Sequence, residues 1–107
     1  MVYPRVMKIQ NEEQTLTVSD ISELTAVNSG TFREEVNAAL ASTPAVVEVD
    51  LSKTRFLDSS GLGALFALYR ATGQSGCTSL RLLNPTPEVR QLLELTQMQQ
   101  LFEIVQR

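Results

Sequence analysis

The stretch FLDSSGLG, residues 56–63, carries side chains that could do chemistry at the point where a helix is expected to begin. Asp58, Ser59 and Ser60 lie there between an apolar segment and two glycines. Side-chain oxygens at such a position accept hydrogen bonds from the free N–H groups of the first turn, so helix capping alone accounts for these residue types. A serine hydroxyl at an exposed helix N-terminus is also a good phosphate acceptor. A phosphate there would place about −1.5 to −2 charges beside Asp58. Both interpretations stay open at this point.

Other chemistry at this stretch lacks the residues that it needs. The chain has no histidine and a single cysteine, Cys77, so a Ser-His-Asp triad, a Cys-His pair and a histidine metal site are excluded within it. Lys8 and Lys53 are the only lysines, and no GxxxxGK[ST] phosphate loop occurs. We therefore expect no catalytic residue, no metal site, no cofactor and no enzymatic activity, and we interpret Cys77 as a structural thiol.

A receiver domain is one alternative for the acidic residues. Asp50 ends a predicted central strand, as a phospho-accepting aspartate would, and Glu12 and Glu13 could imitate the acidic pair of such a domain. Receiver domains also use a lysine late in the chain, and none follows Lys53 here. This weakens the alternative without removing it.

The composition is that of one soluble domain over residues 1–107, with 43% hydrophobic and 20% charged residues. The net charge is −3 and the nine basic residues are scattered, which argues against a nucleic-acid surface. No apolar run approaches the roughly 20 residues that span a bilayer. The N-terminal MVYPRVMKIQ lacks the apolar core of a signal peptide. We expect a cytoplasmic protein that does not insert into membranes.

The first half of the chain predicts a hairpin, a helix and a central strand. Short apolar runs at 6–9 and 15–18 flank the polar NEEQ turn, and 20–28 is expected to be irregular. Apolar residues at helical spacing predict a helix over 31–41, with Thr31 and Glu34 as a capping box. Pro44 helps to end it. The β-branched VVEVDL at 46–51 predicts a buried strand.

The second half alternates helices and strands. Residues 61–72 are apolar on nearly every side, which predicts a helix buried all round that ends at Gly73. Strands are predicted at 80–83 and 101–105, with a helix between them that begins at Thr86-Pro87-Glu88. The resulting order, β-β-α-β-α-β-α-β, indicates an α/β domain with a mixed, partly parallel sheet and packed helices. Ligand sites of such sheets gather beyond the carboxyl ends of the strands, where DSSG lies.

Two segments together resemble a known family. VVEVDLSKTRFLDSSGLGALFALYRA is similar to the central signature of STAS domains, in particular the bacterial anti-sigma factor antagonists, and VRQLLELTQMQQLFEIV resembles their closing helix and strand. The likeness is good over 46–105 and looser before it. It implies the STAS fold and a phosphorylation switch with Ser59 as the acceptor. Asp58, Ser60, Gly61, Leu62 and Thr25 would belong to the partner surface.

The resemblance also implies the partners. The unphosphorylated protein would bind an anti-sigma factor that is also a serine kinase, and so release a sigma factor. Phosphorylation would break this complex, and a serine phosphatase would restore it. The alternative is a non-switching STAS scaffold, or an accessory subunit of a larger regulatory or transport complex. Ser59 beside Asp58 favours the switch.

Three departures from the family pattern bear on this choice. Thr25 stands where the family commonly has an aspartate, which favours the alternative. Gln97-Met98 stands where a glycine usually follows the closing helix. Many members carry one more helix beyond the position of Arg107.

Overall fold

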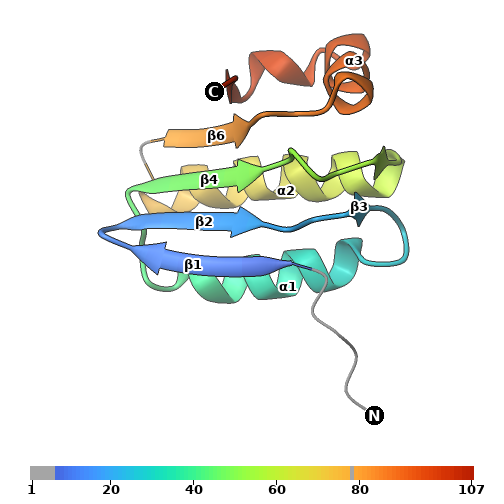
Figure 1. The fold of residues 1–107 in the computed structure, drawn as a ribbon. Helices are drawn as coiled ribbons and strands as arrows, with labels where there is room; N and C mark the ends of the chain where they lie inside the picture. The colour runs from blue at the N-terminus through green and yellow to red at the C-terminus, as the bar shows by residue number, and fades with distance from the viewer. Residues whose placement is uncertain (1–6, 78) are drawn as a thin grey trace.

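A sheet of five strands, in the order β1-β2-β4-β6-β7, forms the centre of the computed structural model, which describes residues 7–77 and 79–107 (Figure 1). β1 is antiparallel to β2, and each remaining neighbour pair is parallel. The strands are β1 (Lys8–Glu12), β2 (Thr15–Ser19), β4 (Val46–Asp50), β6 (Ser79–Leu83) and β7 (Glu103–Val105).

A second, two-stranded parallel sheet pairs β3 (Glu23–Leu24) with β5 (Phe56–Leu57). The helices are α1 (Ser29–Leu40), α2 (Ser59–Ser75) and α3 (Pro87–Leu95), and a short 3-10 helix, η1 (Met98–Gln100), precedes β7. The predicted α/β class and the predicted order of elements are confirmed, and β3 and β5 are additional to it. β3 lies within the segment 20–28 that was predicted to be irregular.

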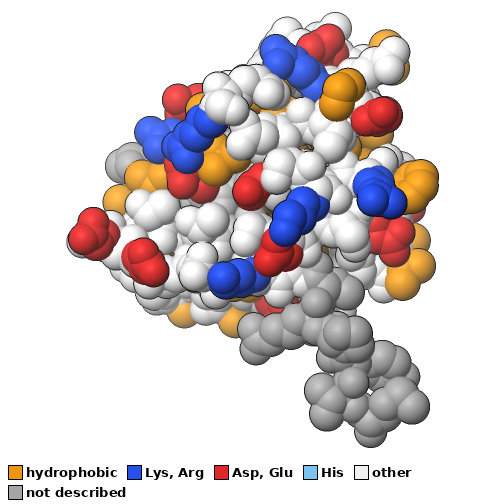
Figure 2. All heavy atoms as spheres, viewed as in Figure 1, with side chains coloured by type: hydrophobic (Ala, Val, Ile, Leu, Met, Phe, Trp, Pro, Cys, Tyr) orange, Lys and Arg blue, Asp and Glu red, His pale blue; other side chains and the backbone are white. Residues whose placement is uncertain are grey.

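The two faces of the large sheet differ in polarity. Val18, Val49 and Leu82 lie side by side in register and are fully buried beneath the helices. On the opposite face, Arg81 lies between Glu48 and Glu103 and bonds to both carboxylates. Figure 1 views the molecule from this second face, with α1 and α2 behind the sheet, and Figure 2 shows charged side chains of both signs dispersed over it. α1 and α2 therefore cover the apolar face.

The opening hairpin is confirmed with a shorter turn than predicted. Glu13 and Gln14 form a two-residue turn with φ of 49° and 66°, and β1 runs on to Glu12. Two positive φ values in succession fit the right-handed twist of the flanking strands, which explains why the turn shrinks to two residues. Val6, the predicted start of the first strand, lies outside the described residues.

α1 begins two residues before the predicted start, and the predicted capping box is wrong. Thr31 lies inside the helix, and Asn28 precedes its first residue without a side-chain cap. The amide of Asn28 instead serves the preceding loop: Oδ1 accepts from Thr25 N at 2.9 Å and Nδ2 donates to Glu23 O at 2.7 Å. The hydrogen bonds that Asn28 makes to the preceding loop, and not a local side-chain cap, therefore determine where α1 begins.

α2 is longer than predicted and is not buried all round. It ends at Ser75 and is capped by Gly76, whose φ of 84° favours glycine, and Gly73 lies inside it. The side that faces the sheet is buried, but Phe66 and Tyr69 are 43% and 38% exposed. The prediction failed because an apolar sequence does not show whether a neighbouring element covers each side of the helix.

The C-terminal elements follow the prediction apart from their bounds. Thr86 caps α3, with Oγ1 accepting from Val89 N. Gln97 adopts φ of 58°, the left-handed conformation that favours glycine. The chain then passes through η1, so β7 begins at Glu103 rather than at Leu101.

Candidate functional site

Asp58 joins the start of α2 to the loop before α1. Its Oδ1 accepts from Gly61 N at 2.9 Å within the first turn, and its Oδ2 accepts from Ala26 N at 3.0 Å. The bond from the Gly61 N–H, followed by that from the Ala26 N–H, lowers the pKa of Asp58 below its usual value. Asp58 is therefore ionised at neutral pH, and it ties together two segments that are far apart in the sequence.

The small sheet places these two segments side by side. Glu23 pairs with Phe56 and Leu24 with Leu57, and Asp58 N donates to Leu24 O at 3.3 Å. Residues 25–28 and the first turn of α2 leave this sheet in the same direction because β3 and β5 are parallel. Two-residue strands carry too little pattern to be read from a sequence, so this arrangement was missed.

Ser59 is the first residue of α2 and is exposed, as the sequence predicted. Ser60 and Leu62 are partly buried. Gly61 is buried against β3 and β5: an added Cβ would overlap the carbonyl oxygen of Leu24 and lie 2.7 Å from Leu57 Cδ1. Gly61 thus lets α2 approach the small sheet and offers little surface of its own.

Two exposed apolar side chains lie on the segments that adjoin the exposed serine. Thr25 Oγ1 accepts from Val27 N at 3.3 Å, and this turn leaves the Val27 side chain 87% exposed. Phe56, on β5, is 65% exposed. We call Val27, Phe56, Asp58 and Ser59 the Ser59 surface. Val27 and Phe56 were not predicted to belong to a functional surface. The sequence offers one signal for Phe56, which is an aromatic residue two positions before Asp58, and none for Val27.

A groove continues the Ser59 surface toward α3. Its volume is about 280 Å³, and its walls are apolar apart from one charge of each sign. The lining residues are Arg55, Phe56, Leu57, Glu88, Val89 and Leu92. Phe56 belongs to both features, so the apolar surface extends beyond the immediate neighbourhood of Ser59.

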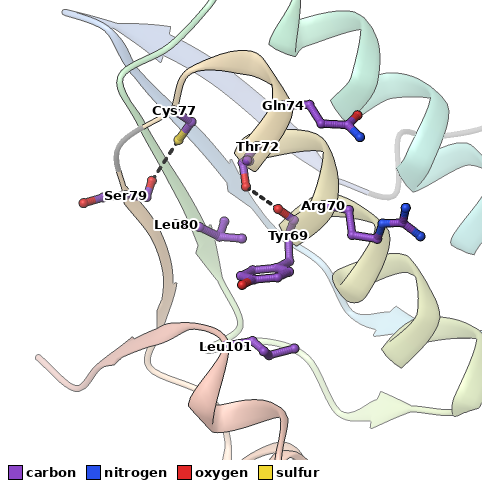
Figure 3. A pocket seen from close by; sticks show the side chains of 9 residues that line it. Tyr69, Arg70, Thr72, Gln74, Cys77, Ser79, Leu80 and Leu101 are labelled. Atoms are coloured by element: carbon purple, nitrogen blue, oxygen red, sulfur yellow. Dashed lines mark hydrogen bonds between the residues drawn. The ribbon is translucent and has the colours of Figure 1, made fainter.

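A second hollow, of about 450 Å³, lies at the other end of α2 (Figure 3). Tyr69, Leu80 and Leu101 line it, and the Tyr69 ring meets Phe102 edge-on at 5.9 Å. Cys77 is fixed at its margin, with Sγ 3.0 Å from Ser79 O and 3.4 Å from Ala45 O. These bonds agree with a structural role for the thiol.

The acidic residues of the receiver alternative do not come together. Glu12 pairs with Thr15, and Thr15 lies beside Val46 at the start of β4. Asp50 is at the other end of β4, where its Oδ1 accepts from Ser52 N at 2.9 Å. Because the length of the strand separates these carboxylates, they cannot form one acidic site. The receiver interpretation is wrong.

Comparison with known proteins identifies STAS domains as similar to this chain. The STAS domain family model matches residues 6–107. A STAS-domain containing protein of Pseudomonas aeruginosa is 40% identical over 65 residues, which cover 61% of this chain and 63% of that protein. The match thus spans less than two thirds of the length of that relative.

Solved structures share the fold at lower identity. A protein from Thermotoga maritima has a TM-score of 0.84 and 19% identity, over 95% of this chain and 86% of that one. The anti-sigma factor antagonist SpoIIAA in its unphosphorylated form has a TM-score of 0.81 and 18% identity, over 94% and 87%. The Bacillus protein SpoIIAA in its phosphorylated form has a TM-score of 0.74 and 17% identity, over 94% and 90%. Within the described ranges, no helix is both long and apolar enough to span a bilayer.

Proposed function

The chain belongs to the STAS domain family, and from this we propose that it is an anti-sigma factor antagonist that is switched off by phosphorylation of Ser59. The observation that carries the proposal is the position of the Ser59 hydroxyl. Ser59 is the exposed first residue of α2, and Val27 and Phe56 are exposed on the two segments that the small sheet brings beside this turn. A kinase can reach it there, and a docked partner would cover it.

The unphosphorylated protein binds an anti-sigma factor that is also a serine kinase, and a sigma factor is released. Val27 and Phe56 supply apolar contacts of the kind that anchor interfaces. The kinase transfers the γ-phosphoryl group of ATP to Ser59 Oγ; ADP leaves, and the hydroxyl proton passes to a base of the kinase. The protein acts by binding and catalyses nothing itself. Because the kinase reaction requires ATP, we expect this cycle to take place in the cytoplasm.

Local electrostatics explains why phosphorylation would break the complex. The lowered pKa of Asp58 keeps its carboxylate charged at neutral pH. A phosphate on Ser59 adds about −1.5 to −2 charges next to it. Burying this pair of anions under a partner would remove them from water, at a cost of several kcal/mol per ion that works against the complex. A serine phosphatase restores binding by hydrolysing the ester with water and releasing inorganic phosphate.

SpoIIAA supports the proposal through the fold. It is an anti-sigma factor antagonist that has been solved in unphosphorylated and phosphorylated forms. The same fold therefore accommodates a phosphorylated state. Identities of 17% and 18% make this an argument about the fold alone.

The decisive experiment uses purified protein, ATP and each serine kinase of the anti-sigma type encoded in the source genome. We expect mass spectrometry to locate one phosphate on Ser59 and calorimetry to show weaker binding afterwards. Ser59→Ala should bind constitutively, and Ser60→Ala is the matched control that should still be phosphorylated. Phosphate on Ser60 alone would move the acceptor by one residue. No phosphate with any kinase would contradict the switch.

A second candidate function is a non-switching STAS scaffold or an accessory subunit of a larger complex. The observation that favours it is Thr25, whose hydroxyl accepts from Val27 N where relatives commonly place an acid. Such a subunit would bind its partner equally well with Ser59 as alanine or as aspartate. The same calorimetry separates the two candidates.

A further inference from the structure

Arg33 projects from α1 across the outer side of α2. Its Nη2 lies 3.5 Å from the position that a Cβ on Gly63 would occupy, which is ordinary van der Waals contact. Arg33 and Ala64 also line the narrow crevice between the two helices. Because residue 63 has no side chain, the guanidinium group of Arg33 can lie directly over the backbone of α2.

Ser59 is one helical turn away from this guanidinium group. Ser59 and Gly63 are four residues apart in α2, so they lie on the same face with Cβ positions about 5–6 Å apart. Cα–Cβ bonds in a helix tilt toward its N-terminus, so the direction left vacant at Gly63 leans toward Ser59. The guanidinium group of Arg33 therefore lies within about 10 Å of the Ser59 Cβ, a span that the long arginine side chain and a phosphoryl group on Ser59 Oγ can close together.

The guanidinium group of Arg33 is available for such a contact. It forms no ion pair or side-chain hydrogen bond with any residue in 7–77 and 79–107, whereas Arg81, Arg90 and Arg107 are each paired with a glutamate. The nearby carboxylate of Asp58 already accepts two backbone N–H groups. Neither residues 25–28 nor β5 contributes a charged side chain near Ser59.

We propose that Arg33 binds the phosphoryl group of phosphorylated Ser59 within the same chain, across the gap left by Gly63. The proposal rests on Ser59 being the acceptor in the proposed function. A guanidinium group offers a planar pair of N–H donors that match two phosphate oxygens. The bound phosphoryl group lies along the exposed face of α2, where it occupies the surface that a partner would cover. Arg33 is a positioning residue for the phosphorylated state.

The test uses full-length protein with phosphoserine installed at position 59 during translation, so that no kinase is needed. Phosphorus-31 NMR then follows the second ionisation of the phosphate with pH, in the parent protein and in Arg33→Gln. The charged groups on the elements around this turn are Arg33 on α1, Asp58 at the start of α2, Glu23 on β3 and Arg55 directly before β5. Losing Arg33 should raise the second pKa of the phosphate by about 0.3–0.7 unit, the size expected for an exposed ion pair.

Arg70→Gln is the matched control. Arg70 is exposed on the same side of α2 and is also unpaired among the described residues, but it lies about 16 Å along the helix axis from Ser59. It should leave the phosphate pKa unchanged, and Arg33→Lys should restore part of the shift. Equal shifts in Arg33→Gln and Arg70→Gln would indicate a general field and overturn the proposal, as would no shift in either. Since the phosphate is installed directly, these outcomes are separate from whether a kinase modifies Ser59.

Discussion

The first turn of α2 and the second half of α2 are held in different ways. In the first turn, Asp58 accepts from Gly61 N and Ala26 N, and Gly61 packs directly on the backbone of β3. Further along the helix, Phe66 and Tyr69 stack with ring centroids 6.2 Å apart and remain partly exposed, and Tyr69 lines a hollow of about 450 Å³.

The difference shows where position is specified and where it is not. The hydrogen bonds of Asp58 and the backbone contact of Gly61 restrict the first turn to a single arrangement. An exposed acceptor needs such a fixed position if a kinase and a partner are to recognise it. Aromatic packing beside a hollow allows more freedom, because few atoms oppose a shift of the rings. One helix thus presents a rigid end and a more adaptable end.

Substituting aspartate at two consecutive residues of α2 should give the largest contrast. Leu65→Asp buries an unpaired charge in the core, at a cost of several kcal/mol against a total stability of about 5–15 kcal/mol, and should unfold the domain. Phe66→Asp places the same charge on a side chain that is 43% exposed and should leave a folded protein. Thermal melts followed by circular dichroism measure both. Two similar melting temperatures would mean that the helix is rotated from the orientation described.

Adding one methyl group at each end of α2 should give effects of opposite sign. Gly61→Ala forces a Cβ against the Leu24 carbonyl group, and overpacking of this kind destabilises by about 1–3 kcal/mol. Gly73→Ala meets no atom within 4 Å and should stabilise the helix by about 0.5–1 kcal/mol. Urea unfolding curves give both values. A loss of stability at Gly73 would contradict the account of a loosely opposed second half.

Short-range chemistry explains what the sequence could predict. The alternation of Leu16 and Val18 indicated β2, and the Thr86 hydroxyl ahead of Pro87 indicated the start of α3. The position of Ser59 followed from capping residues ahead of an apolar helix. Each of these signals lies within a few residues of the feature that it predicts, so no knowledge of the tertiary structure was needed.

Contacts between distant segments explain what the sequence could not predict. The pairing of β3 with β5 joins residues about thirty positions apart, through strands too short to show a period. The start of α1 depends on bonds that Asn28 makes to the loop, although Thr31 was an equally good local cap. The exposure of Phe66 and the position of Arg33 over Gly63 depend on which elements pack together.

The smallest predicted effect tests the bonds of Asp58 through pH. Its pKa is lowered in the folded state, mainly by the N–H groups of Gly61 and Ala26, so its charge contributes stability above its usual pKa, and this contribution is lost as pH falls through the lowered value. Asp58→Asn keeps the shape and capping ability but loses the charge. The variant should melt a few degrees below the parent protein at pH 7, and the two curves should converge in acid.

Asp20→Asn is the control that identifies the source of the effect. The pKa of Asp20 is also lowered, but chiefly by the Lys53 side chain, with which it forms an exposed ion pair of 2.9 Å. High salt screens an exposed pair over a few ångströms, whereas backbone N–H groups donate regardless of ionic strength. In about 1 M NaCl, at which the Debye length is near 3 Å, the difference for Asp20→Asn should largely vanish and that for Asp58→Asn should persist. If both differences vanish together, a general electrostatic field, and not the bonds to Gly61 and Ala26, positions the first turn of α2.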